Sequence, residues 1–425
     1  MVCISLTSRC ALNAIYYATD KRMSQLASNA EKLMKNSSNA IAVQLTLLIV
    51  STLTVMSNAT ISPSLPVMRE HFSNVENSHY LVRLVLTIPS LCVAITAPGA
   101  GILVDRLGRK RLLAAGLVLY GLAGSSGLWL NSISLILVGR SFLGLSVAAI
   151  MISATTLIAD YYSGAIRTRF LGWQSAAMAL GGFVFVSVGG ILADIGWRLP
   201  FLIYLAALVL LPLVLLFLPE PRRDRSSTTA ANDADPTHLP LGLVVFTCAI
   251  ALIVQAMYYI VPVQLPFYLQ QLTNASASQS GFAIASSTLF IATSSILHQR
   301  FKARFSFITI YEMGFLSMGV GFGIISLANG YVIVLLGLAI AGFGVGLVVP
   351  NMNLCLTSIT PSLLRGRVLG SLTTCFFLGQ FLSPLLSQPL SERVGLATTY
   401  ALAGGLLIFL GGATFVVMSR HRQWA

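Results

Sequence analysis

Charged residues are scarce in this chain: Asp, Glu, Lys and Arg together make up 9% of its 425 residues. Soluble globular domains carry about 25%, so a water-soluble fold is excluded. Hydrophobic residues make up 56%, and the apolar runs have the length of about 20 residues that lets a helix cross the hydrocarbon core. Strands of membrane β-barrels are about 10 residues long and alternate polar with apolar side chains. An all-α integral membrane protein is therefore predicted.

Cysteine is also rare, and the six cysteines include no CxxC pair. Small apolar packing residues are the interpretation that this spacing favours over metal ligands or redox pairs. The glycine-rich segment 342–346 lies deep in an apolar run with no strand before it, which indicates close helix packing and not a nucleotide loop. Since the sequence offers no nucleotide loop, metal cluster or nucleophile arrangement, we expect neither a cofactor nor enzymatic activity.

Twelve apolar runs follow one another, and a polar stretch rich in Ser, Thr, Asp and Pro separates the first six from the last six. The runs cover approximately residues 40–62, 80–104, 112–130, 133–158, 170–193, 199–218, 241–268, 279–297, 306–327, 331–356, 368–390 and 396–418. We expect a cytoplasmic tail over 1–38, a six-helix bundle over 39–218, a cytoplasmic linker over 219–240, a second bundle over 241–418 and a cytoplasmic tail over 419–425.

Basic residues outnumber acidic ones, and the formal net charge is +13 at pH 7. If the N-terminus is cytoplasmic, 21 of the 26 Lys and Arg residues fall on the cytoplasmic side and 4 on the other, with Arg140 inside a run. An excess of Lys and Arg marks cytoplasmic loops. Both termini are therefore predicted to be cytoplasmic, and the positive charge requires no nucleic-acid partner.

The two sets of six runs carry matching segments. Three pairs match at offsets of 198 or 200: residues 167–172 with 365–370, Asp194 with Glu392, and residues 65–66 with 265–266. Internal repeats of this kind place a transporter's substrate site at the interface of the repeats, near the middle of the bilayer. Two pseudo-symmetric six-helix bundles are predicted.

Four motifs lie within these runs or at the turns between them. They are Gly101-Ile-Leu-Val-Asp105-Arg106-Leu-Gly108-Arg109-Lys110-Arg111, Gly139-Arg140 followed by Gly144, Ser62-Pro63-Ser64-Leu65-Pro66, and Gly189-Gly190-Ile-Leu-Ala-Asp194-Ile-Gly-Trp197-Arg198. Together they resemble the signature motifs of the major facilitator superfamily, and most of all its twelve-span drug:proton antiporters. The resemblance implies the major facilitator fold and transport by rocking of two bundles. One departure is that Phe185 and Val186 stand where those antiporters usually carry Gly-Pro.

The resemblance also implies a conformational latch, made of Asp105, Arg106, Gly108, Arg109 and Asp160. In it Arg109 pairs with Asp160, and Asp105 faces the N-terminus of the eleventh helix, whose dipole favours an anion. We expect these contacts to form only when the two bundles close on the cytoplasmic side. The alternative is that the charged turn only determines topology.

Arg140 lies about eight residues into the fourth run, roughly 12 Å from its outer end at about 1.5 Å per residue. A guanidinium at that depth is costly unless it meets a wet cavity or a partner, and such residues are functional by default. Two interpretations are open. Arg140 binds an anionic group or tunes a nearby carboxylate, or it is a structural arginine bonded to backbone carbonyls.

Family analogy places the substrate cavity between spans 1, 4, 7 and 10, with parts of 2, 5, 8 and 11. The polar and aromatic candidates for contact with substrate or protons there, besides Arg140, are Asn58, Gln174, Gln255, Tyr258, Tyr259, Asn351, Asn353, Phe376, Phe377 and Gln380. Each could instead pack or bond between helices.

Glu312 is the one carboxylate clearly inside a run, and residues 40–69, which include the first run, contain no acid. Glu312 is a candidate for proton coupling, as are Asp160 and Asp105. The competing interpretation is an ion pair of Glu312 with Arg300 or Arg304 near the cytoplasmic face. The sequence alone leaves both open.

These observations predict a monomeric, proton-coupled exporter of small organic molecules in the inner membrane of a bacterium, with the lipid bilayer, the solute and protons as its partners. One alternative keeps the fold and reverses direction: an uptake symporter or facilitator, which the missing Gly-Pro permits and which accumulation by cells would reveal. A second alternative is a non-transporting membrane sensor on the same scaffold, because fold does not fix function.

Overall fold

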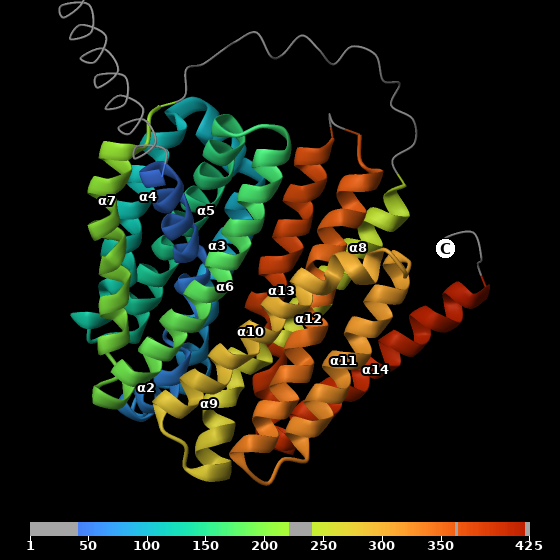
Figure 1. Cartoon of the computed structure of the whole chain (residues 1–425). Helices are drawn as coiled ribbons and strands as arrows, with labels where there is room; N and C mark the ends of the chain where they lie inside the picture. Colours follow the sequence, from blue (N-terminus) through green and yellow to red (C-terminus); the bar gives the residue numbers. More distant parts are fainter. Residues whose placement is uncertain (1–40, 221–239, 362–363, 421–425) are drawn as a thin grey trace, which may run out of the picture.

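The computed structural model describes residues 41–220, 240–361 and 364–420. Side chains are described in these ranges except at 100–103, 105, 106, 165 and 415–420. Within these ranges, twelve helical segments are long and apolar enough to cross a membrane (Figure 1). This confirms the predicted all-α membrane architecture. The predicted N-terminal tail and most of the predicted linker and C-terminal tail lie outside the described residues.

The first half begins with an unlabelled helix over 41–59. Its further elements are η1 (Ser62–Ser64), α2 (Leu65–His71), α3 (Ser78–Leu107), α4 (Arg109–Gly124), η2 (Ser125–Leu128), α5 (Ile133–Tyr161), α6 (Gly164–Ile195), η3 (Leu199–Leu205) and α7 (Ala206–Phe217). The second half contains α8 (Leu241–Tyr258), α9 (Ile260–Thr273), α10 (Ala277–Lys302), α11 (Phe307–Ser326), α12 (Tyr331–Ile359), α13 (Arg365–Val394) and α14 (Leu396–Arg420).

The first and seventh spans are each built from broken helices. The helix over 41–59, η1 and α2 together form the span Ile41–His71, while α8 and α9 form Leu241–Thr273. Proline lacks an N–H and cannot complete the preceding turn, and prolines occupy the first turns of η1 and α2. The two breaks fall about one repeat apart in the sequence, so the halves share this interruption.

Two helix pairs hold the halves together, α3 against α13 and α6 against α10. These are the second, eleventh, fifth and eighth spans, so each half contributes equivalent helices. In Figure 1 the elements up to α7 form one group and those from α8 onward form the other. The arrangement is the pseudo-symmetric pair of bundles that the sequence repeat indicates.

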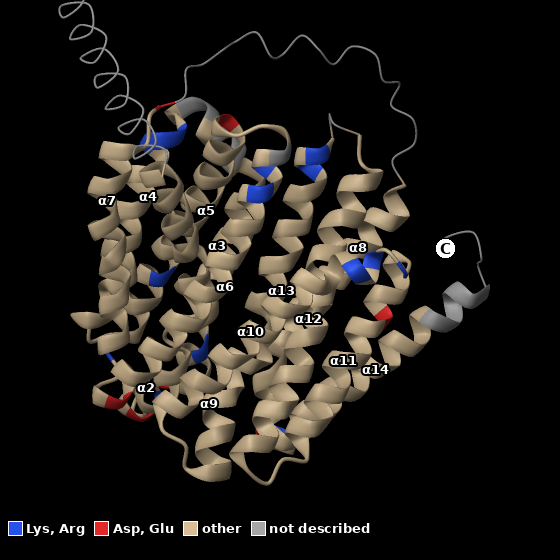
Figure 2. Cartoon of the chain, in the orientation of Figure 1, with Lys and Arg blue, Asp and Glu red and all other residues tan. Residues whose placement is uncertain are grey.

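Lys and Arg gather at the end of the bundle where α3 turns into α4 (Figure 2). We call it the basic end and the other the opposite end. Gly108 makes the turn with φ = 88°, a left-handed conformation that a residue with a Cβ rarely adopts. It caps α3 and starts α4 directly. The charged motif therefore forms a tight turn between two spans, as its sequence indicates.

The halves meet at the opposite end and separate toward the basic end (Figure 1). A Cβ added to Gly190 on α6 would lie 2.8 Å from the carbonyl oxygen of Ala277, and one added to Gly281 on α10 would lie 2.9 Å from that of Val186. Near the basic end, a Cβ added to Gly172 or Gly370 would meet nothing within 4 Å. The interface is thus closed at one end only.

Candidate functional site

Four uncharged polar side chains meet midway along the interface of the halves. We call Asn58, Ser90, Gln255 and Gln380 the central amide cluster. The Asn58 amide donates to the Ser90 hydroxyl at 2.8 Å, and that hydroxyl donates to Gln380 Oε1 at 2.8 Å. Longer bonds of 3.4 Å join Asn58 to Gln380 and Gln380 to Gln255. All four side chains are buried, so the cluster joins the two halves in an apolar surrounding.

Three predicted candidates, Asn58, Gln255 and Gln380, are brought together in this cluster. Ser90 completes it and escaped sequence reasoning, because a single serine in an apolar run carries no distinguishing pattern. Tyr259 is buried at the break between α8 and α9. The Tyr258 hydroxyl lies 2.9 Å from the Ser287 hydroxyl on α10. The aromatic groups of the seventh span thus border the cluster from the second half.

Other candidates lie elsewhere. The Gln174 amide donates to the Ser51 hydroxyl at 2.8 Å, within the first half. The Asn351 amide donates to the carbonyl of Phe307 at 2.7 Å and lies 3.4 Å from His298. Asn351 therefore ties α10, α11 and α12 together within the second half, away from the central amide cluster.

Arg140 is completely buried on α5. Its Nε donates to the carbonyl of Val85 at 2.9 Å and its Nη2 to the carbonyl of Ser57 at 3.2 Å. The guanidinium carbon lies 5.0 Å from the centre of the Tyr204 ring, and the Tyr204 hydroxyl also donates to Ser57 at 2.8 Å. Of the two interpretations, these contacts favour the structural one: Arg140 holds the first span and α3 beside Asn58.

Glu312 lies on α11, which packs mainly against α12 and α14 at the edge of the second half. Its side chain is buried but joins no ion pair with Arg300 or Arg304, so that expectation is wrong for the described side chains. Lys302, from the same basic segment, instead places its ammonium 3.6 Å from the centre of the Phe307 ring. The helix that carries Glu312 packs mainly against α12 and α14, whereas the central amide cluster lies on the first span, α3, α8 and α13.

Arg109 and Asp160, two members of the latch, form an ion pair with Nε 3.1 Å from Oδ2. Both residues belong to the first half, and the pair is present while the halves stand apart at this end. The expectation that the pair requires closure on this side is therefore wrong, because its two partners move as one body. Gly108 lies in the adjoining turn; the side chains of Asp105 and Arg106 lie outside those described.

At the opposite end, Asp194 binds across the interface. Its carboxylate oxygens accept hydrogen bonds from the backbone N–H groups of Ala277 at 2.7 Å and Ser278 at 3.2 Å, in the first turn of α10. A helix N-terminus presents free N–H groups and a positive dipole end. The carboxylate at the end of α6 thus caps a helix of the other half.

Glu392, the repeat partner of Asp194, makes the equivalent contact at the start of α3. Its Oε1 lies 3.1 Å from Nε2 of His79, and His79 corresponds to Ala277 at the same offset of 198. A repeated carboxylate therefore joins the halves twice, through backbone groups on one side of the pseudo-axis and through a side chain on the other.

His79 and Glu392 belong to a larger hydrogen-bonded set, the opposite-end network of His79, Arg83, Gln264, Gln388 and Glu392. Arg83 Nε donates to Gln264 Oε1 at 3.0 Å, and the Gln264 amide donates to Gln388 Oε1 at 3.1 Å. The Gln388 amide then donates to Glu392 at 2.9 Å. Sequence reasoning missed this network, although polar side chains within apolar runs were its available signal.

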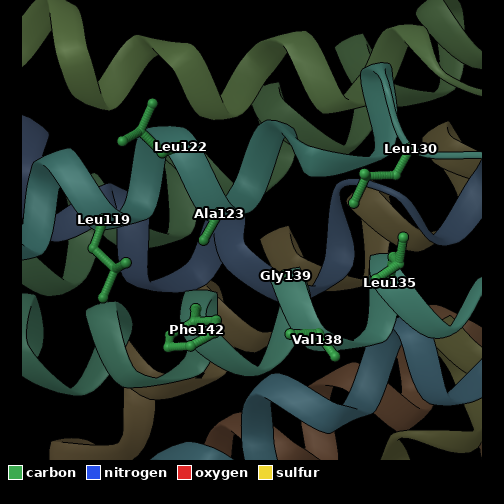
Figure 3. Close-up of a pocket in the computed structure, with 8 residues that line it drawn as sticks. All are labelled: Leu119, Leu122, Ala123, Leu130, Leu135, Val138, Gly139 and Phe142. Carbon is green, nitrogen blue, oxygen red and sulfur yellow. The ribbon is translucent and has the colours of Figure 1, made fainter.

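A pocket of about 430 Å³ lies between α4 and α5 and is lined only by apolar groups (Figure 3). Leu122, Leu135 and Val138 on its rim are more than half exposed. Such a surface suits lipid acyl chains, and no polar group is present to orient a solute. We therefore assign the candidate site to the central amide cluster.

Comparison with known proteins agrees with this geometry. "Multidrug resistance protein 1" of Bacillus subtilis (strain 168) is 36% identical over 139 residues, which cover 31% of this chain and 36% of that protein. "Quinolone resistance protein NorA" of Staphylococcus aureus (strain Mu50 / ATCC 700699) is 24% identical over 341 residues, covering 79% of this chain and 86% of the relative. The solved D-xylose-proton symporter has the same fold, with a TM-score of 0.74 at 17% identity, over 88% of this chain and 97% of that one.

The family resemblance found in the motifs is confirmed over nearly the whole described chain. The model of the Major Facilitator Superfamily matches residues 47–384 and again residues 246–424. The twelve candidate membrane helices and the two equivalent halves agree with that match. The chain belongs to the Major Facilitator Superfamily, a family of membrane transporters.

Proposed function

We propose that this chain exports small amphipathic organic molecules in exchange for protons, by rocking of its two halves. The observation that carries the proposal is the central amide cluster, whose hydrogen bonds join Asn58 and Ser90 of one half to Gln380 of the other. Rocking breaks these bonds, and a bound solute can then satisfy the freed groups. A solute moves such an equilibrium only by binding one arrangement better than another.

The chemistry of the cluster indicates the kind of solute. Amide and hydroxyl groups both donate and accept, so they recognise polar groups without requiring a charge. Phe376 and Phe377 are partly exposed one helical turn from Gln380 and offer aromatic surface. No carboxylate of the described residues joins the cluster, and Arg140 donates to the carbonyl of Ser57, the residue before Asn58. Neutral or anionic solutes therefore suit the site better than cations.

We assign the basic end to the cytoplasm of a bacterium, because cytoplasmic loops are enriched in Lys and Arg. The arrangement described here, open at the basic end, is then the inward-facing state. The names of two relatives, a multidrug resistance protein and a quinolone resistance protein, support export as the direction. We further propose that Asp160 or Glu312 carries the coupled proton and that the chain works as a monomer.

Proteoliposomes with an imposed proton gradient test this function. The internal pH is followed while neutral, anionic and cationic aromatic solutes are added in turn, and solute uptake is measured in parallel. We expect solute-dependent proton movement for neutral or anionic solutes, and its loss in Asn58→Leu and Gln380→Leu. Gln271→Leu removes an exposed amide outside the cluster and serves as the matched control.

Each result bears on a separate part of the proposal. Solute movement without protons would contradict exchange, and equal activity of Gln380→Leu and wild type would remove the cluster from the pathway. Asp160→Asn and Glu312→Gln distinguish the two candidate proton carriers, because only the variant that lacks the carrier should move solute without moving protons. Loss of coupling in neither variant would contradict both assignments.

A second candidate function is uptake of a solute by the same rocking motion. The observation that favours it is Val186, which stands where the antiporters carry the proline of Gly-Pro and whose carbonyl lies against Gly281 at the interface. The structural likeness to a D-xylose-proton symporter is compatible with this direction. Accumulation of a labelled solute by intact cells, abolished by Gln380→Leu, would favour uptake over export.

A further inference from the structure

Two basic side chains, His79 and Arg83, lie one turn apart on α3 and bind acceptor groups supplied by the other half. His79 meets the carboxylate of Glu392 on α13 at 3.1 Å, and Arg83 donates to the amide oxygen of Gln264 on α9 at 3.0 Å. Side chains four residues apart on a helix are neighbours on one face. The first half thus presents a pair of hydrogen-bond donors to the second half.

Arg83 is an unusual residue for this position. Its side chain is 2% exposed, yet no carboxylate oxygen of the described residues lies within salt-bridge distance of it. The guanidinium carbon lies 4.0 Å from the centre of the Phe267 ring, and Nη1 donates to the carbonyl of His79 at 2.8 Å. A buried cation without an anionic partner is costly, and an arginine buried within a membrane span is functional by default.

The partners of this pair belong almost entirely to the second half. Gln264, Phe267 and Glu392 all lie on α9 or α13, while only the carbonyl of His79 moves together with Arg83. When the halves separate at the opposite end, α3 therefore loses the three partners at once. The Arg83 guanidinium and the His79 imidazole then lie on one exposed face of α3. Their N–H groups point at the space that the amide oxygen of Gln264 and the carboxylate of Glu392 have left.

We propose that His79 and Arg83 form an anion-binding site that is exposed when the opposite end opens, and that the carboxylate, sulfonate or phosphate group of a transported solute replaces Glu392 and Gln264 there. An anionic group suits this position, since the carboxylate of Glu392 already lies against His79 in the closed arrangement. The inference rests on the proposed transport function and narrows its substrates to organic anions.

The charges around the pair support an anion and not a cation. Arg69 adds a second guanidinium over the Phe267 ring, with its guanidinium carbon 5.4 Å from the ring centre. Tyr80 packs its ring 4.6 Å from that of His79, which leaves an aromatic surface beside the donors. Glu70, the nearest acid on α2, already accepts from Gln270 at 3.4 Å. An amphipathic anion would find both a charge partner and an apolar wall.

The site also links solute binding to gate opening. Because Gln264 and Glu392 cover the donors in the closed arrangement, an anion binds only after the opposite end has opened. A ligand that binds one state alone shifts the equilibrium toward that state. An anionic solute that reaches this pair would stabilise the open arrangement and hold it until the solute is released.

Two spin labels report the opening in the purified protein. Cysteines at Ser73 and Gln271, both exposed on the two halves at this end, carry the labels in a background without native cysteines. The probes are 2-naphthoate and 2-naphthalenesulfonate, with methyl 2-naphthoate as the uncharged analogue. We expect both anions to lengthen the distance between the labels and the ester to leave it unchanged.

Variants then assign the effect to the pair. Arg83→Gln should weaken anion binding at least tenfold and His79→Gln at least threefold, while Arg83→Lys keeps most of the affinity because it keeps the charge. Arg198→Gln is the control, since Arg198 binds Leu128 and Asn131 within the first half. Equal effects of anion and ester, or unchanged anion affinity in Arg83→Gln, would overturn the proposal.

This experiment separates the site from the transport function. Solute transport that persists in wild type without any contribution of Arg83 to anion affinity would refute the site and leave the function standing. Anion-induced opening that depends on Arg83, without transport of any solute, would uphold the site and refute the function. Thermal unfolding of Arg83→Lys at the wild-type temperature would show that the fold tolerates changes at this position, so that loss of binding in Arg83→Gln reports the site.

Discussion

The Ser62 hydroxyl donates a hydrogen bond to the carbonyl of Pro262, a residue 200 positions away. The same separation relates Glu70 to Gln270, whose side chains also bond to each other, and it is the offset that matches residues 65–66 with 265–266. Positions equivalent by a two-fold repeat can touch each other only beside the axis that relates them. The pseudo-two-fold axis therefore passes between the first and seventh spans at the opposite end.

Joining the halves at this axis should stop the transport cycle. Cysteines at Glu70 and Gln270, coupled by a short bifunctional thiol reagent, are expected to hold the opposite end closed and to abolish solute exchange in proteoliposomes. Cleavage of the linker should restore at least half of the rate. Full transport with the cross-link in place would show that this end does not open. Each single cysteine, treated with the same reagent, is the control.

Closure of the opposite end depends on contact between backbones. The Cβ of Gly281→Leu would overlap the carbonyl of Val186 at 2.9 Å, and overpacking of this kind costs about 1–3 kcal/mol. Since about 1.4 kcal/mol is a factor of ten in an equilibrium, the closed arrangement should lose roughly tenfold in population. Distances between spin labels at Ser73 and Gln271 would report the change.

The control for Gly281→Leu is Gly405→Leu, because a Cβ added to Gly405 meets nothing within 4 Å. Both substitutions place the same bulk within a membrane helix, so they differ only in the contact. A shift of equal size in the two variants would refute the packing argument.

Arg140 is expected to act on folding more than on solute binding. Arg140→Ala removes the donors to Val85 and Ser57 and leaves a cavity beside Tyr204, at a cost of about 3–5 kcal/mol. Arg140→Lys keeps the charge but loses the planar fork, so both variants should unfold at lower temperature than wild type.

A structural role predicts a specific pattern for the Arg140 variants. The fraction that remains folded should bind solute with less than threefold loss of affinity. Normal thermal stability with solute binding lost would instead make Arg140 a solute contact. Arg169→Gln, on an exposed part of α6, controls for the loss of a basic residue.

The charges of the Arg109–Asp160 ion pair can be exchanged by substitution. Arg109→Asp and Asp160→Arg should each lower transport severalfold, because each places two like charges about 3 Å apart. The double variant restores opposite charges and should recover most of the rate. Arg111→Gln, in the same turn but exposed, should transport within twofold of wild type. Failure of the double variant to recover would indicate that Asp160 has a role beyond the pair.

Sequence reasoning was most successful where one run of residues carries the signal. Twelve apolar runs gave twelve spans, and the offset of 198 related Asp194 to Glu392 before either contact was known. It was least successful where two distant segments must meet. Ser90 joins the central amide cluster because α3 packs against α13, and Gln264 joins the opposite-end network because it meets Arg83 of α3. Their neighbours in sequence reveal neither contact. Whether the Arg109–Asp160 contact requires closure of the basic end likewise depends on whether its two partners belong to the same half.

The two carboxylate contacts at the opposite end differ in how they can change during evolution. Asp194 binds N–H groups of Ala277 and Ser278 that every amino acid except proline provides, so substitutions at those positions leave the contact intact. Glu392 binds the side chain of His79, which a single replacement removes or alters. Positions 277 and 278 are therefore expected to tolerate substitution without loss of their contact, whereas substitution at position 79 removes or alters the contact with Glu392.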